Sequence, residues 1–86
     1  MICAQAIQAL QNLESALRAV GATASDVMKL NIYVKDYKPT DAALISAALR
    51  KYFPQSNLPT STWLGVQSLA EEGFLIEVDA IAVVGR

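Results

Sequence analysis

The sequence contains no histidine and only one cysteine, Cys3, among its 86 residues. Without histidine, Ser-His-Asp and Cys-His nucleophile pairs are excluded, and so are histidine metal ligands. One cysteine cannot form an internal disulfide, and with no histidine it cannot complete a zinc site within the chain. We therefore expect no metal, and any chemistry must rest on carboxylates, hydroxyls, backbone amides, lysine or arginine.

Further absences narrow the class of protein. Neither GxGxxG nor GxxxxGK[ST] occurs, so no loop for nucleotide phosphates is predicted. The formal net charge of −1 offers no basic surface for nucleic acid. No apolar run approaches the length of about 18 residues that spans a membrane, and no signal peptide is recognisable. We expect a cytoplasmic protein, consistent with its single cysteine, with neither a membrane nor nucleic acid as a partner.

Hydrophobic residues are abundant, at 53% of the chain against 17% charged residues. This length predicts one domain, residues 1–86, near the lower size limit for an independent core. So apolar a composition in a short chain indicates a face that another subunit covers. We therefore expect an oligomer.

Hydrophobic periodicity predicts two amphipathic helices. The first covers residues 2–20 and ends at Gly21, with an inward face of Ala6, Leu10, Leu13, Leu17 and Val20. The second begins with Thr40 or Asp41 as its cap and runs to about Phe53. Its expected inward face comprises Leu44, Ala47, Ala48 and either Phe53 or Tyr52.

Period-two alternation predicts three strands. In the segment VMKLNIYVKD, Met28, Leu30, Ile32 and Val34 alternate with polar residues. A polar loop at residues 54–59 precedes two further strands, at about 60–68 and 74–84, which we expect to pair as an antiparallel hairpin turning at Gly73. The order α-β-α-β-β, with both helices on one sheet face, predicts an α+β two-layer sandwich.

The order of these segments resembles the RidA family (YjgF, also labelled L-PSP endoribonuclease). The resemblance spans residues 4–84 and rests on QALQNLESALRAVGATASDVMKLNIYVKD, then RKYFP, then LPTSTWLGVQSLAEEGFLIEVDAIAV. It implies a chorismate-mutase-like homotrimer with small-molecule clefts between subunits. It further implies hydrolysis of enamines and imines to 2-oxo acids and ammonia, without a metal or cofactor.

The sequence departs from the family pattern in three places. The family arginine that clamps the substrate carboxylate falls on Ser61, within Pro59-Thr60-Ser61, and a hydroxyl supplies no charge. A second-helix asparagine of the family falls on Ser46. The family's N-terminal β-hairpin has no counterpart before Met1, so we expect a late start, a hairpin supplied otherwise, or a reduced fold. The missing arginine predicts a ligand that is neutral or carries its charge elsewhere.

Glu77 matches the family carboxylate that orients the attacking water, and it is our candidate catalytic residue. Strand alternation places it with Asp79 on the face away from the helices, whereas Phe74, Ile76, Val78, Ala80 and Ala82 face them. The alternative is that both carboxylates are solvated or bind Lys29 or Lys35, as exposed carboxylates commonly do.

The candidate ligand-binding residues are Ser46, Ser61, Thr62 and Trp63. The hydroxyls of Ser61 and Thr62 either bind an anion together with strand amides or cap the turn after Pro59. Trp63 either stacks on a ligand ring or anchors the core or an interface. The sequence favours the anchoring role for Trp63. It does not decide whether Ser61 and Thr62 bind an anion or cap the turn.

Three function classes follow. We favour a RidA-family small-molecule-binding trimer with an inter-subunit cleft and weak or no enamine/imine deaminase activity. The alternative is an active 2-iminobutanoate/2-iminopropanoate deaminase, a hydrolase acting on C–N bonds. An endoribonuclease is disfavoured because the chain has no basic patch and no histidine base. The sequence leaves open whether the protein is an enzyme.

Overall fold

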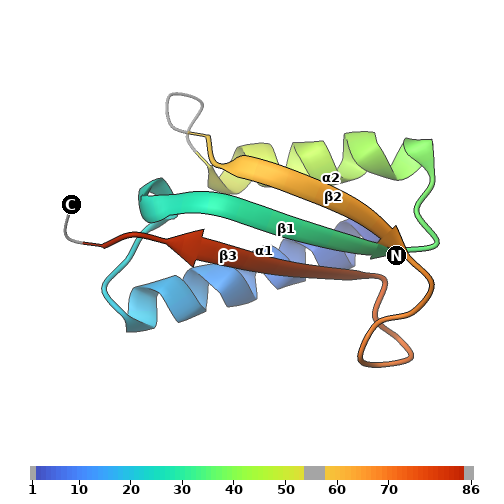
Figure 1. The fold of residues 1–86 in the computed structure, drawn as a ribbon, viewed down its shortest axis with the longest axis horizontal. Coiled ribbons are helices and arrows are strands. Elements are labelled where there is room, and N and C mark those ends of the chain that lie inside the picture. Colours follow the sequence, from blue (N-terminus) through green and yellow to red (C-terminus); the bar gives the residue numbers. More distant parts are fainter. Residues whose placement is uncertain (1, 54–57, 85–86) are drawn as a thin grey trace.

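The computed structural model describes residues 2–53 and 58–84. Two helices lie on one face of a three-stranded sheet (Figure 1), which confirms the predicted α+β two-layer arrangement. Of the predicted loop at 54–59, residues 54–57 lie outside the described residues. In chain order the elements are α1 (Ile2–Ala19), the 3-10 helix η1 (Ala24–Asp26), β1 (Val27–Lys35), α2 (Pro39–Tyr52), β2 (Thr60–Val66) and β3 (Ile76–Ala82).

The strand order differs from the expected C-terminal hairpin. The order is β2-β1-β3, with β1 parallel to β2 and antiparallel to β3, so β2 and β3 are the two edges (Figure 1). The segment 67–75 passes around the end of β1 instead of turning tightly at Gly73. Two backbone bonds hold it there, from Asp36 N–H to Val66 O (3.0 Å) and from Lys35 N–H to Leu75 O (2.9 Å). The hairpin prediction was therefore wrong.

The central strand β1 supplies the middle of the core. Leu30, Ile32 and Val34 are at most 1% exposed and point toward the helices, as their alternation predicted. Met28 is 44% exposed, contrary to prediction, and Val27 is buried in its place. A shift in the β1–β3 register between Val27 and Lys29 explains the exchange, because an irregular residue reverses the alternation of side chains on either side of it.

The first helix ends as its glycine predicted. Gly21 has φ +76°, its N–H donates to Arg18 O (3.1 Å), and the N–H of Ala22 donates to Leu17 O (2.8 Å). This pair of bonds is a Schellman motif, and the buried side chains of Leu17 and Ala22 accompany it. Val20 is 70% exposed and not part of the core, contrary to prediction, because the chain has already left the helical path there.

The second helix begins earlier than predicted. Lys38 is the residue before the first turn and Pro39 is the first helical residue, a position where proline's missing N–H has no helical partner to lose. Asp41 lies three residues beyond Lys38 and accepts a bond from its backbone N–H (3.0 Å). Thr40 and Asp41 therefore lie within the first turn and are not the cap.

The buried face of α2 confirms the prediction at Ala48 and Phe53 and contradicts it at Leu44 and Ala47. Ile45, Ala48 and Phe53 are buried, whereas Leu44 and Ala47 are exposed. Apolar residues surround this helix on nearly all sides, so periodicity alone does not select the buried stripe. The core formed between the two layers comprises Ala6, Leu10, Leu17, Ala22, Val27, Leu30, Ile32, Val34, Ile45, Ala48, Phe53 and Ile76.

The last strand has the predicted orientation. Ile76 is buried, and Val78, Ala80 and Ala82 pack against the core, while Glu77 and Asp79 are exposed. Phe74 lies before the strand and is 44% exposed, contrary to prediction. Among the residues that the structure describes, no helix has the length and apolar character needed to cross a membrane.

Candidate functional site

A cavity of about 250 Å³ opens between α2 and the beginning of β2. Parallel pairing of β2 with β1 brings Ser61 opposite Leu30, so Ser61 lies on the helix side of the sheet. Ser46 on α2 faces the same space, and the structure therefore brings these two predicted ligand-binding residues together. The lining residues are Leu30, Ser46, Leu49, Arg50, Phe53, Leu58, Pro59 and Ser61.

The hydroxyl of Ser61 is held by its neighbour. The indole Nε1–H of Trp63 donates to Ser61 Oγ over 3.1 Å, which leaves the hydroxyl hydrogen of Ser61 available for another acceptor. Trp63 itself is partly buried and packs against the core, opposite Ile32 in the parallel ladder. Its position supports the anchoring role and also orients Ser61 at the cavity.

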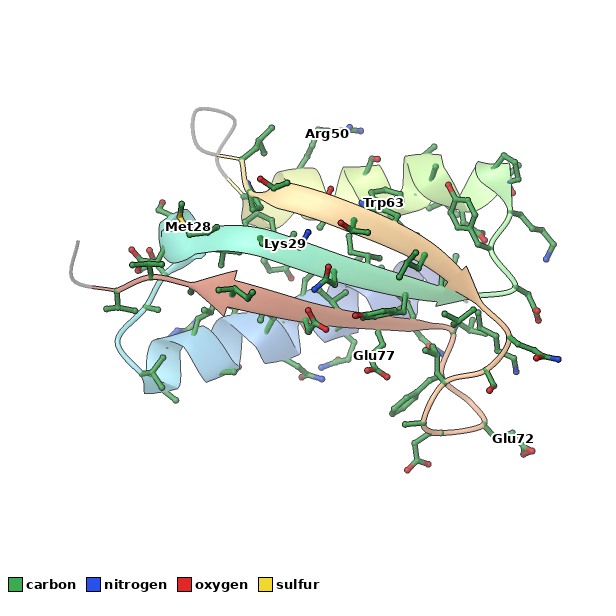
Figure 2. The ribbon with its side chains drawn as sticks, viewed as in Figure 1. Met28, Lys29, Arg50, Trp63, Glu72 and Glu77 are labelled. Carbon is green, nitrogen blue, oxygen red and sulfur yellow. The ribbon has the colours of Figure 1, made fainter. Side chains whose placement is uncertain are left out.

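Arg50 also lines this cavity, and the sequence prediction missed it. Arg50 follows Ser46 by four residues, and positions four apart share one face of a helix. This spacing was visible in the sequence and, combined with the choice of Ser46, would have indicated Arg50 as a further residue bordering the same space. Arg50 is exposed, and Figure 2 shows its nitrogen atoms directed outward from α2, away from the sheet.

Thr62 lies on the opposite face of the sheet from Ser61 and away from the cavity. It pairs with Asn31, and its hydroxyl accepts a bond from Lys29 Nζ (2.9 Å). Asp79 lies on the same open face and accepts bonds from Asn31 Nδ2 (2.8 Å) and Tyr33 Oη (3.3 Å). Asp79 is exposed, and its partners are an amide and a phenol, whereas the alternative expected either solvation or a bond to Lys29 or Lys35.

The hydrogen-bonded group of Asn31, Tyr33 and Asp79 on the open sheet face raises the pKa of Tyr33. Desolvation raises the pKa of Tyr33 above its ordinary value of 10.0, and the charge of Asp79 raises it further. The hydrogen bond to Asp79 and the charge of Glu77 add in the same direction. Each effect disfavours a phenolate, so Tyr33 remains a neutral donor at physiological pH.

Glu77 lies far from the cavity within one chain. It pairs with Tyr33 on the open face of the sheet, and β1 separates its strand from β2. Figure 2 shows Glu77 beside β3 and Arg50 on α2, beyond the opposite edge strand β2. Glu77 instead borders a second hollow of about 420 Å³, which lies between α1 and the outer edge of β3.

Beside this second hollow, the side chain of Gln5 holds the segment that precedes β3. Gln5 on α1 donates from Nε2 to Gly73 O (2.9 Å), and its Oε1 accepts from Leu75 N–H (2.7 Å). These two bonds fix the segment that leads into β3 and so position Glu77. In the described part of the chain, no group of three or more potential metal-ligating side chains is gathered.

Comparison with known proteins supports the resemblance drawn from the sequence. Residues 1–84 match the family model described as Endoribonuclease L-PSP. A "RutC family protein" of Haemophilus influenzae is 34% identical over 85 residues, covering 95% of this chain and 63% of that protein. A "2-iminobutanoate/2-iminopropanoate deaminase" of Salmonella typhimurium is 32% identical over 84 residues, with coverages of 95% and 63%.

Solved structures agree with this match. A Rid-family protein of unknown function from Yersinia pestis superposes with a TM-score of 0.93 at 36% identity, covering 98% of this chain and 63% of that one. The YjgF gene product of E. coli gives a TM-score of 0.85 at 30% identity, with coverages of 99% and 66%. The chain spans less than two thirds of the length of the curated relatives named above. By its sequence and by its fold, this chain belongs to the L-PSP endoribonuclease family, which is the RidA (YjgF) family.

Proposed function

We propose that this chain binds a small molecule in a cleft between the subunits of a homotrimer. The observation that carries the proposal is the separation of Glu77 from the cavity at Ser46 and Ser61. Ser61 lies on the helix-covered face of the edge strand β2, beneath Ser46 on α2, whereas Glu77 lies on the open face of the opposite edge strand β3. A carboxylate and a cavity placed in this way can act on one ligand only when they come from two different chains.

The open sheet face supports the assembly. Leu64 and Ile81 lie on it, opposite Tyr33 and Lys29, and are 47% and 58% exposed. Between them lies the hydrogen-bonded group of Asn31, Tyr33 and Asp79. Apolar side chains around satisfied polar groups are typical of an interface between subunits. A second subunit bound to this open sheet face would also place its own residues next to Glu77.

We further propose that hydrolysis of 2-iminobutanoate or 2-iminopropanoate by this chain is weak or absent. Ser61 occupies the strand position at which the family arginine is expected. A charge-assisted bond contributes about 1.5–3 kcal/mol where a neutral one contributes about 1 kcal/mol. An imino acid held only by the hydroxyl of Ser61 would therefore be poorly fixed for attack by water that Glu77 orients.

An active deaminase is the second candidate function. Relatives that bear this name are 31–32% identical to the chain, and the chain keeps a carboxylate, Glu77, at the family position. The two candidates make opposite statements about turnover, so a single assay separates them. RNA cleavage gains no support from the cavity, because the described residues that line it include neither a carboxylate nor a histidine.

The test combines an imine-hydrolysis assay with sedimentation analysis. We expect a trimer at micromolar concentration, slow hydrolysis by the unmodified protein, and faster hydrolysis by Ser61→Arg. Glu77→Ala should remove the activity that Ser61→Arg gains without changing the assembly. A stable monomer would refute the shared cleft. Turnover by the unmodified chain equal to that of an arginine-bearing relative, and lost in Glu77→Ala, would refute weak hydrolysis.

A further inference from the structure

The interior of the cavity between α2 and the start of β2 is uncharged. Among its described lining residues only Arg50 is ionised, and Arg50 is exposed with its nitrogen atoms directed outward, away from the sheet (Figure 2). The four residues that precede Leu58 in the chain, PQSN, carry no charge either. An anion in this cavity would exchange its hydration shell for neutral groups, and such an exchange costs free energy.

The position of the cavity along α2 also disfavours an anion. The lining residues on the helix side belong to its last two turns and its C-cap, and they are Ser46, Leu49, Arg50 and Phe53. Aligned peptide dipoles give a helix C-terminus a partial negative charge. Arg50 and Lys51 are exposed in this turn, so water and salt screen their charge from the cavity. An uncharged ligand avoids both penalties.

Two hydroxyls supply the polar contacts in the cavity. The indole Nε1–H of Trp63 donates to Ser61 Oγ over 3.1 Å, so one lone pair of this oxygen is occupied. Within residues 2–53 and 58–84, the hydroxyl hydrogens of Ser46 and Ser61 have no protein acceptor. A carbonyl oxygen accepts such hydrogens, and the lone pairs that remain on the hydroxyls accept amide N–H groups. The polar groups of the cavity therefore match an amide.

We propose that the cavity binds a small, uncharged aliphatic amide. The proposal rests on the proposed ligand site at Ser46 and Ser61 and names the class of molecule that it takes. A volume of about 250 Å³ limits the ligand to a few heavy atoms beyond the amide group. The remaining walls are apolar and accommodate an alkyl chain: Leu30, Leu49, Phe53, Leu58 and Pro59.

The experiment compares two probes of nearly equal shape by NMR titration at neutral pH: butanamide, which is uncharged, and butanoate, which is ionised. The unmodified chain should bind butanamide at least about tenfold more tightly than butanoate. Ser61→Ala removes one hydroxyl and should weaken butanamide binding about fivefold. Ser61→Arg adds a guanidinium at the same position and should reverse the preference, because a guanidinium pairs with a carboxylate.

Three further variants serve as controls. Thr62→Ala removes a hydroxyl from the opposite face of β2, and it should change neither affinity by more than about twofold. Arg50→Gln removes the exposed guanidinium and should leave the affinity for butanamide unchanged. Ser46→Leu fills the cavity and should abolish binding of both probes. The amide spectrum recorded in each titration shows whether the variant is folded.

Several results would overturn the inference. Butanoate binding that equals or exceeds butanamide binding in the unmodified chain, and that Ser46→Leu abolishes, would refute an uncharged ligand and still support the proposed ligand site. Equal losses of butanamide affinity in Ser61→Ala and Thr62→Ala would mean that the hydroxyl at the cavity is not the contact. The absence of binding by either probe, or binding that Ser46→Leu leaves unchanged, would refute the ligand site itself and the inference with it.

Discussion

Replacing Gln5 with alanine tests how the strand that carries Glu77 is held in place. Gln5 makes two bonds to a segment about 70 residues away in sequence: it donates to Gly73 O (2.9 Å) and accepts from the partly buried Leu75 N–H (2.7 Å). The variant loses the first bond and leaves the Leu75 N–H without its partner. A lost exposed bond costs about 0.5–1.5 kcal/mol and an unsatisfied, partly buried donor about 1–3 kcal/mol. We expect the free energy of unfolding to fall by about 2–3 kcal/mol.

Gln8→Ala is the matched control for this variant. Gln8 lies on the same helix, lines the same hollow, and makes one exposed bond from Nε2 to Asn12 Oδ1 (2.9 Å), four residues away. A pair of this kind contributes about 0.2–0.5 kcal/mol to a helix. The two variants remove the same side chain and differ mainly in the long-range bonds that are lost.

Urea denaturation at a fixed protein concentration measures the difference, since assembly would make the apparent stability depend on concentration. Hydrogen exchange of the Leu75 amide gives a local readout, and its protection should fall in Gln5→Ala and persist in Gln8→Ala. If the two variants unfold within about 0.5 kcal/mol of one another and protect Leu75 equally, the bonds of Gln5 do not hold the segment before β3, and the reasoning fails.

Two further predictions concern acidity and backbone conformation. Asp79→Asn should lower the pKa of Tyr33 toward 10.0, measured by ultraviolet titration, and an unchanged pKa would show that the carboxylate does not act on the phenol. Because the pKa of Tyr33 is raised in the folded state, the contribution of Tyr33 to stability is complete below pH 10.0 and is lost as the pH rises through the folded-state pKa. Above pH 10.0, the unmodified chain should therefore lose more stability than Asp79→Asn. Gly21→Ala should lower the thermal stability by about 1–2 kcal/mol, since φ at this position is +76°, and equal melting temperatures would contradict the argument.

Local pattern accounts for much of the fold. Alternation placed Leu30, Ile32 and Val34 in the core, since side chains in a strand point to opposite faces in turn. Gly21 marked the end of the first helix because only a residue without a Cβ adopts its conformation at little cost. Met28 was wrongly predicted to face the core, because a register irregularity between β1 and β3 reverses the alternation of side chains. That irregularity depends on the pairing with β3, which the pattern of one strand does not reveal.

The sequence pattern did not predict which strands pair with one another in the sheet. Two successive strand patterns joined by a segment with Gly73 favour a hairpin, but β1 lies between β2 and β3. Parallel pairing of β1 with β2 depends on α2 covering the sheet, and such contacts join residues distant in sequence. The burial of Ile45 in place of Leu44 has the same origin, because packing against the rest of the fold decides which side of α2 is covered.

The candidate site divides in the same way between local and long-range causes. The sequence by itself determined the family, the layered fold and the residue types present, including a serine at the arginine position and a carboxylate at Glu77. Only the tertiary structure decided that Ser46, Arg50 and Ser61 share one cavity while Thr62 and Glu77 lie on the other face of the sheet. The physical reason is that residue type follows from the chain alone, whereas neighbours in space follow from strand register and helix packing, which join segments far apart in the sequence.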